Sequence, residues 1–203
     1  MEATRSLQLD RSDAEFFSAA RLRAARLQPY LASAVFSLIP VPSPGYGTFG
    51  VDRWWRVYVD MAVAREWGVE ATAAVLLHEA HHVIRDHHGR ADRLKLQSSQ
   101  RVRWNVAGDL AINDDLLEDG LALPDPVLPQ QFGFAVGEIE ERYFQMLGPE
   151  DPVERDSCGS GSGGDPIEGE IDDEPTESGA DGLDGVDQEA IRRTVAHDVD
   201  QSI

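Results

Sequence analysis

Two histidines four residues apart, His78 and His82, and the glutamate between them, Glu79, have the spacing best suited to chemistry. Residues four apart lie one above the other on a helix, so both imidazoles can present a nitrogen to one metal ion. The pattern H-E-x-x-H is typical of zinc peptidases, in which Zn²⁺ lowers the pKa of a water molecule to about 7. Glu79 is then predicted to accept a proton from that water as general base and to pass it to the leaving amine.

The residues around this motif indicate that it is buried. Ala71–Leu77 and Val83–Ile84 are largely apolar, and apolar residues recur at helical spacing from Val69 to about Asp86. Two imidazoles and a carboxylate are costly to bury without a ligand or partners. The motif is therefore predicted to lie on a buried helix and to hold a metal ion.

A third ligand is needed, because a catalytic zinc ion usually has three protein ligands and one open position. The best source is a helix predicted for Gln100–Leu117, on which Asn105, Asp109 and Asn113 fall at i, i+4 and i+8. These polar side chains share one face of an otherwise apolar helix, and Gly108 would allow close approach to a neighbouring helix. The alternative is a helix with one solvated polar stripe.

The chain resembles bacterial metallopeptidase domains that commonly precede a von Willebrand factor A-like domain. The resemblance covers most of residues 20–200 and rests on the histidine motif, Pro29–Ala34, Trp104–Asp109, Leu128–Gly133, Glu141–Phe144 and Cys158–Gly161. It implies a zincin-like fold, Asp109 as the third zinc ligand and a MoxR-type AAA+ ATPase as a partner. The printed sequence contains no A-like domain, which departs from that arrangement.

The other histidines have weaker claims to the metal. His81 lies about 60° around the helix from His78, which favours packing or a supporting role over ligation. His87 falls where the family often has a further histidine, but on an unbroken helix it would face away from His78. It could turn inward only if the helix ended near Asp86. The remaining two are expected at the surface: His88 and His197.

Three further residues are candidates for supporting or regulatory roles. Asn105 and Asn113, one turn on either side of Asp109, are expected to orient the carboxylate or the substrate. Cys158 is flanked by glycine in an acidic segment, and its thiol is a candidate for occupying the open position of the metal and keeping the enzyme latent. The alternative for Cys158 is a cysteine without a special role.

The elements around these residues predict an α+β fold. Ser12–Glu15 has the form of a capping box that opens a helix to about Leu27, and Tyr30–Leu38 is predicted as a second, buried helix. Three prolines between Pro40 and Pro44 are predicted to end regular structure. Trp55–Asp60 alternates as a strand, with Thr48–Val51 as its hairpin partner.

The expected architecture is a small, mostly antiparallel sheet packed on helices. Trp55–Asp60 is expected at its edge, bordering the cleft and pairing with an extended substrate. A further short helix is predicted for Val136–Leu147. The chain divides into a zincin-like metallopeptidase domain over 1–148, an acidic Gly/Ser-rich flexible segment over 149–186 and a C-terminal helix over 187–203.

Charge and composition indicate which partners and which cellular compartment to expect. The formal net charge is −19, of which −14 falls from Glu150 onward. The sequence contains no cluster of basic residues of the kind that binding to nucleic acid requires. The acidic segment has too few large apolar residues to offset its ordering entropy. A single cysteine, no signal peptide and no apolar stretch of about 20 residues predict a cytoplasmic protein away from the membrane.

Two rival functions share these features. One is a metal-containing regulatory or binding module that acts with a partner ATPase or another protein. A structural zinc site is usually closed by four protein ligands, so ligation by Cys158 or His87 would favour that reading. The other is a zinc hydrolase whose substrates are not peptides, since the same water activation would serve it.

Overall fold

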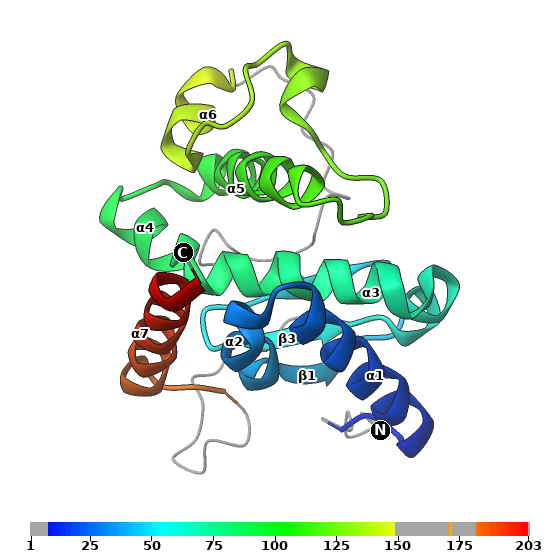
Figure 1. Cartoon of the computed structure of the whole chain (residues 1–203). Coiled ribbons are helices and arrows are strands. Elements are labelled where there is room, and N and C mark those ends of the chain that lie inside the picture. Colours follow the sequence, from blue (N-terminus) through cyan, green and yellow to red (C-terminus); the bar gives the residue numbers. More distant parts are fainter. Residues whose placement is uncertain (1–7, 149–170, 172–181, 203) are drawn as a thin grey trace, which may run out of the picture.

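The computed structural model describes residues 8–148, 171 and 182–202 (Figure 1). Its helices, in chain order, are α1 (Arg11–Leu27), the 3₁₀ turn η1 (Pro29–Leu31), α2 (Ala32–Ser37), α3 (Met61–Ile84), α4 (His87–Arg93), α5 (Ser98–Glu118), the 3₁₀ turn η2 (Pro129–Phe132), α6 (Glu140–Met146) and α7 (Gly185–Ser202). Its strands are β1 (Ile39–Pro42), β2 (Phe49–Val51) and β3 (Arg56–Val59). The fold is helix-rich α+β, and within the described ranges no helix has the length and apolar character needed to cross a membrane.

The sheet has three strands in the order β1-β3-β2. The hairpin forms as predicted, with β2 antiparallel to β3 and Val51 opposite Val57. However, β1 runs parallel to β3, so the prediction of a mostly antiparallel sheet is wrong and the sheet is mixed. The prediction that Trp55–Asp60 lies at the edge is also wrong, because β3 is the central strand with a partner on each side.

Strand β1 was not predicted, because its sequence Ile-Pro-Val-Pro contains two prolines. Pro40 and Pro42 alternate with Ile39 and Val41, so the positions that lack an N–H are two apart and face one side of the strand. That side is the outer edge of the sheet, where no ladder hydrogen bond is needed. A proline-containing segment can therefore be an edge strand, although it cannot be a central one.

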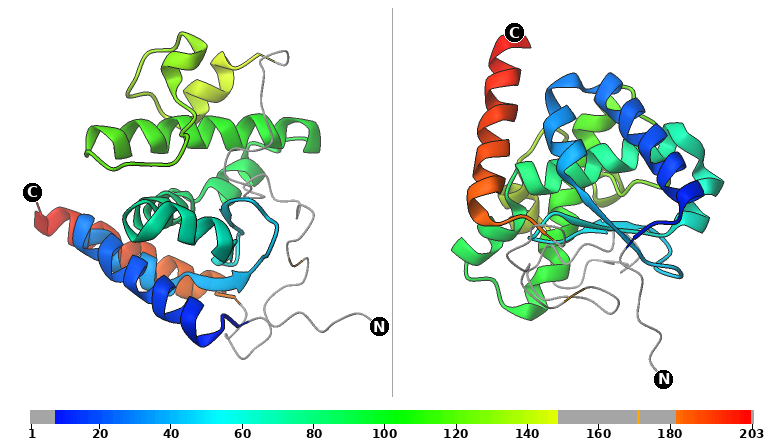
Figure 2. Two further views of the ribbon diagram at one scale, coloured as in Figure 1. Left: turned by 90° about the vertical axis from the view of Figure 1, so that its right-hand side faces the viewer. Right: turned by 90° about the horizontal axis from the view of Figure 1, so that it is seen from below.

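Helix α3 lies between the sheet and helix α5 (Figure 1, Figure 2), and the structure has two hydrophobic cores. The larger core joins the sheet to α1, α2 and α3, with fully buried residues such as Phe49, Trp55 and Leu76. The smaller core lies between α5 and α6 and includes Leu110 and Tyr143. Helix α5 packs along α3, so the polar side chains that α3 and α5 direct toward each other meet between the two cores.

Several element boundaries differ from prediction. The N-cap of α1 is Asp10, whose Oδ1 accepts from the Asp13 amide at 2.8 Å, so the capping box predicted at Ser12–Glu15 is wrong. Helix α3 begins at Met61, eight residues early, and has a non-helical turn at Gly68 with φ 77°. Helix α4 was not predicted. Helix α6 is shorter than expected, because it begins only at Glu140.

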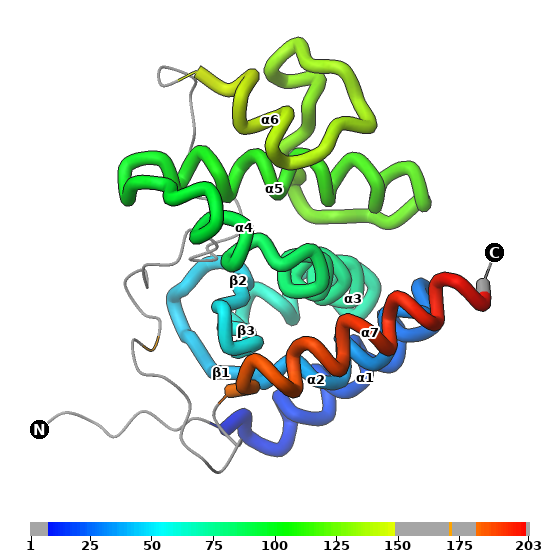
Figure 3. Tube along the Cα trace, turned by 90° about the vertical axis from the view of Figure 1, so that its left-hand side faces the viewer, coloured from blue at the N-terminus to red at the C-terminus, as the bar shows by residue number. Residues whose placement is uncertain are grey.

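The C-terminal part of the described chain packs on the sheet half. Helix α7 contacts η1 and α2, and Figure 3 shows it crossing that side of the molecule. The Leu183 amide donates to the Trp54 carbonyl at 2.8 Å, which ties the start of this part to the β2–β3 hairpin. Most of the predicted flexible segment 149–186 lies outside the described residues, and the division into three regions stays a prediction.

Candidate metal centre

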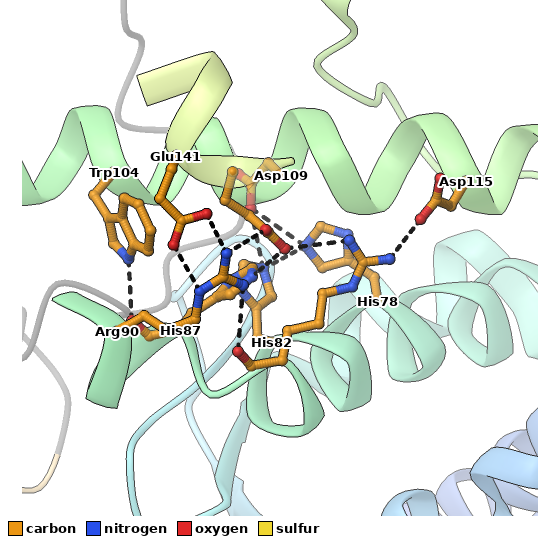
Figure 4. Close-up of polar contacts among 10 residues, drawn as sticks. His78, His82, His87, Arg90, Trp104, Asp109, Asp115 and Glu141 are labelled. Atoms are coloured by element: carbon orange, nitrogen blue, oxygen red, sulfur yellow. Dashed lines mark hydrogen bonds and ion pairs between the residues drawn. The ribbon is translucent and has the colours of Figure 1, made fainter. Parts of the chain in front are cut away.

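His78, His82 and Asp109 converge at the contact between α3 and α5 (Figure 4). Each of the three offers one nitrogen or oxygen atom, and these atoms lie within 4.8 Å of one another. Among the described residues, these three form the group that could hold a metal ion. Asp109 Oδ1 lies 3.1 Å from His82 Nε2 and 3.5 Å from His78 Nε2, and the two Nε2 atoms are 2.9 Å apart. All three residues are at most 5% exposed.

Asn113 determines which nitrogen of His78 faces this group. Asn113 Nδ2 donates to the Val127 carbonyl at 3.0 Å, which leaves Oδ1 directed at His78 Nδ1 at 2.8 Å. An amide oxygen only accepts, so His78 Nδ1 carries the hydrogen and the lone pair of the neutral ring is on Nε2. That lone pair points toward a carboxylate oxygen and a second imidazole, an arrangement that suits a cation between them. The residues therefore fit a metal ion.

His82 has a different neighbour. Helix α3 ends at Ile84, and Asp86 adopts the left-handed conformation with φ 53°, which redirects the chain into α4. This turn brings His87 inward, and its Nδ1 lies 2.8 Å from His82 Nδ1. His87 is thus not among the three converging residues, and instead contacts His82 at the ring nitrogen that faces away from Asp109.

The electrostatics of the group are those of a site for a cation. Burial lowers the pKa of His82 to about 3, so its ring is neutral at physiological pH. Burial would raise the pKa of Asp109, but its close contacts with His78 and His82 outweigh burial and lower that pKa. For His78, burial is outweighed by the Asp109 carboxylate, and its pKa is raised. A proton on His78 Nε2 and a metal ion would compete for the same place.

A pocket of about 250 Å³ opens beside this group. His78, Glu79, Asp109 and Asn113 line one side, so Glu79 lies at the same opening as two of the converging residues. The other walls come from the segment before β2, from α3 and from the loop after α5, and are formed by Gly47, Thr48, Val63, Trp67, Val75 and Leu123–Val127. Much of this lining is apolar.

The remaining predicted site residues are placed as follows. Asn105 is buried one turn before Asp109 on α5. His81 faces Gln28, with its Nε2 3.3 Å from Gln28 Oε1, and lines a separate pocket. The prediction of a surface position for His88 is wrong, because its exposed fraction is 6%. The candidate latency thiol, Cys158, lies outside the described residues.

Glu140 is a buried acidic residue of this region that sequence reasoning missed. It is the first residue of α6, it is 2% exposed, and its Oε1 accepts from His87 Nε2 at 2.8 Å. No local pattern pointed to it, because Glu140 and Glu141 are equivalent in sequence and only the docking of α6 on α5 makes one of them internal. Arg85 and Arg90 contact the same carboxylate, at 3.2 and 2.8 Å.

The chain matches a known protein family. Residues 13–201 match the model of a family described as "Putative metallopeptidase domain". The match includes all the residues of the site. No curated protein and no solved structure matches the chain.

Proposed function

The chain belongs to this metallopeptidase family, and on that premise we propose that it is a zinc-dependent peptidase whose metal is held by His78, His82 and Asp109. The observation that carries the proposal is the convergence of two imidazole nitrogens and one carboxylate oxygen beside a pocket that Glu79 also lines. Nitrogen and oxygen ligands in this number are those of catalytic zinc sites.

Zinc, when bound, lowers the pKa of a water molecule and polarises a carbonyl group. Glu79 is placed to take the proton of the attacking water and to return it to the leaving amine. Asn113 keeps Nε2 of His78 toward the metal, and its link to Val127 joins that ligand to the wall of the pocket.

The side chains that line the pocket indicate which kind of substrate it would accept. Val63, Trp67, Val75 and Leu123 form an apolar surface facing the group. We expect a peptide to place an apolar side chain there, next to the bond that is cleaved. Thr48, directly before the edge strand β2, borders the same pocket, so an extended peptide would run along this segment.

The number of ligands favours an enzyme over a structural metal module. In the part of the chain that is described, three side chains converge, which leaves a coordination position of a tetrahedral ion for water or substrate. A closed structural site would need a fourth protein ligand. His87, the nearest further histidine, directs one nitrogen to His82 and the other to Glu140.

The test is hydrolysis of an unfolded protein substrate by the zinc-loaded wild type and by Glu79→Gln. The variant should keep near-stoichiometric zinc and lose at least about 100-fold in kcat, the lower end for a general base. Glu70→Gln is the matched control, because Glu70 lies on the same helix, is exposed and pairs with Arg23. Equal hydrolysis by wild type and Glu79→Gln would show that the proposal is wrong.

A further inference from the structure

His82 is connected through His87 to a buried carboxylate on another helix. His82 Nδ1 lies 2.8 Å from His87 Nδ1, and His87 Nε2 lies 2.8 Å from Glu140 Oε1. The three residues come from α3, α4 and α6, and all are at most 2% exposed. Figure 4 shows His87 beside His82. Glu140 is not among the converging ligands.

The hydrogens along this chain of contacts can be assigned from the carboxylate inward. An ionised carboxylate only accepts, so His87 Nε2 carries a hydrogen and, in the neutral ring, His87 Nδ1 is an acceptor. His82 Nδ1 must then donate to it, and the lone pair of His82 is left on Nε2. Nε2 is the nitrogen 3.1 Å from Asp109. The carboxylate thus selects the tautomer that a metal ion needs.

Glu140 is itself held in place. Arg85 Nη1 contacts its Oε1 at 3.2 Å and Arg90 Nη2 contacts its Oε2 at 2.8 Å. The backbone around His87 is held too, because Trp104 Nε1 donates to the His87 carbonyl at 3.1 Å. A fixed anion at the end of the chain polarises the N–H groups that point toward it and so raises the electron density of the rings, which makes His82 Nε2 a stronger electron donor.

We propose that Glu140 and His87 are positioning residues that set the metal affinity of the site by holding His82 with Nε2 toward the ion. The inference rests on the metal site of the proposed function and extends it to helix α6. The two histidine ligands are then supported differently. His78 is oriented by the neutral amide of Asn113. His82 is oriented by His87, whose ring is in turn hydrogen-bonded to the carboxylate of Glu140.

The experiment compares wild type, Glu140→Ala, Glu140→Gln and Glu141→Gln. Glu141 is the matched control, since it adjoins Glu140 and pairs with Arg90, but the contact with His87 is made by Glu140. The zinc Kd is measured by competition with a chelator, and the visible spectrum of the cobalt(II)-loaded protein reports the ligand field. Urea unfolding of the metal-free proteins identifies conditions in which every variant is folded.

Glu140→Ala should weaken zinc binding by about 10- to 100-fold, the range for loss of a partner that orients a ligand, and should alter the cobalt spectrum. Glu140→Gln keeps an acceptor oxygen and should weaken binding less. Glu141→Gln should match wild type. Unchanged Kd and spectrum in Glu140→Ala, or equal weakening in Glu141→Gln, would overturn the inference even if lower apo stability shows that Glu140 supports the fold.

The outcome also separates this inference from the proposed function. If wild type binds zinc, Glu140→Ala binds it weakly and neither hydrolyses peptides, the positioning role stands and the peptidase proposal fails. If wild type hydrolyses peptides and both Glu140 variants bind zinc as tightly as it does, the positioning role alone fails. Failure of wild type to bind zinc overturns both.

Discussion

Each imidazole at the metal centre has two nitrogens, and a different neighbour occupies the one that faces away from Asp109. For His78 the neighbour is Asn113 and for His82 it is His87. In both cases the ring nitrogen directed at Asp109 is Nε2. Because a histidine that rotates freely loses entropy on binding a metal, these contacts prepare the ligands in advance.

Asp109 is the ligand whose role most needs a test. Asp109→Ala should weaken zinc binding by more than about 100-fold, beyond the range for partners that only orient a ligand, because a direct bond is lost. The measurement is the zinc Kd by chelator competition. Asp115→Ala is the control, since Asp115 lies on the same helix, is about half exposed and pairs with Arg85. Wild-type affinity in Asp109→Ala would remove Asp109 from the ligand set.

The stability of the protein at acid pH tests the environment of Glu140. Burial would raise its pKa, but the hydrogen bond from His87 and the charge of Arg90 outweigh burial and lower it from 4.5. A carboxyl group with a lowered folded-state pKa contributes stability that is present above the unfolded-state pKa and is lost as pH falls through the folded-state pKa. The stability that wild type has over Glu140→Gln should therefore shrink below about pH 4.5.

This is measured as the free energy of urea unfolding of the metal-free proteins at several pH values from 6 to about 3, where carboxyl groups titrate. Using the difference between the two proteins cancels most of the effect of the other acidic residues. If the difference in unfolding free energy between wild type and Glu140→Gln stays constant over this range, the ionised form of Glu140 does not stabilise the protein more than the protonated form does.

At the scale of elements, the position of His87 depends on how closely α4 and α5 approach. Gly108, on α5, faces its ring, and a Cβ built there would lie 2.7 Å from His87 Nδ1 and 2.8 Å from Cε1. The ring cannot move away easily, since both its nitrogens have hydrogen-bond partners. The glycine therefore permits a contact that any side chain would block.

Gly108→Ala decides between two effects of opposite sign. Helix propensity alone would stabilise the protein by about 1 kcal/mol, whereas overpacking a buried site costs about 1–3 kcal/mol. Because the clash is with a ring held on both sides, we expect the variant to be less stable and to bind zinc more weakly. Thermal unfolding and zinc titration measure the two quantities, and a rise in Tm would contradict the close approach.

At the scale of the whole molecule, the C-terminal helix supports the end of the helix that carries the motif. Arg192, on α7, donates from Nε to the Val83 carbonyl at 2.9 Å and from Nη2 to Asp86 Oδ1 at 3.2 Å. Val83 belongs to the last turn of α3, and Asp86 is the left-handed residue that redirects the chain toward His87. A residue 105 or more positions away in sequence thus holds the turn behind the metal centre.

Neighbouring arginines provide a matched test of this support. Arg192→Ala should lower the free energy of unfolding by about 1 kcal/mol, less than a fully buried charged hydrogen bond because its side chain is 22% exposed. Arg193→Ala should change it by less than about 0.5 kcal/mol, since Arg193 is 78% exposed and pairs with Glu189 on its own helix. Equal effects in chemical denaturation would mean that α7 does not support the turn.

The sequence by itself determined the features that depend on local periodicity. A spacing of four places His78 above His82 on one helix, and the same spacing puts Asn105, Asp109 and Asn113 on one face of another. The hairpin and the approximate limits of α1, α2 and α5 follow from patterns within a few residues of each other. The family resemblance added Asp109 as the third ligand, and the structure has Asp109 beside both histidines.

Only the tertiary structure decided what depends on segments far apart in the chain. Strand order is such a property, and the parallel pairing of β1 with β3 makes the predicted edge strand central. The turn at Asp86 and the docking of α6 on α5 bring His87 and Glu140 behind His82, across 58 residues from His82 to Glu140. Hydrogen bonds between side chains require distances near 3 Å, and periodicity within one helix says nothing about the distance to another.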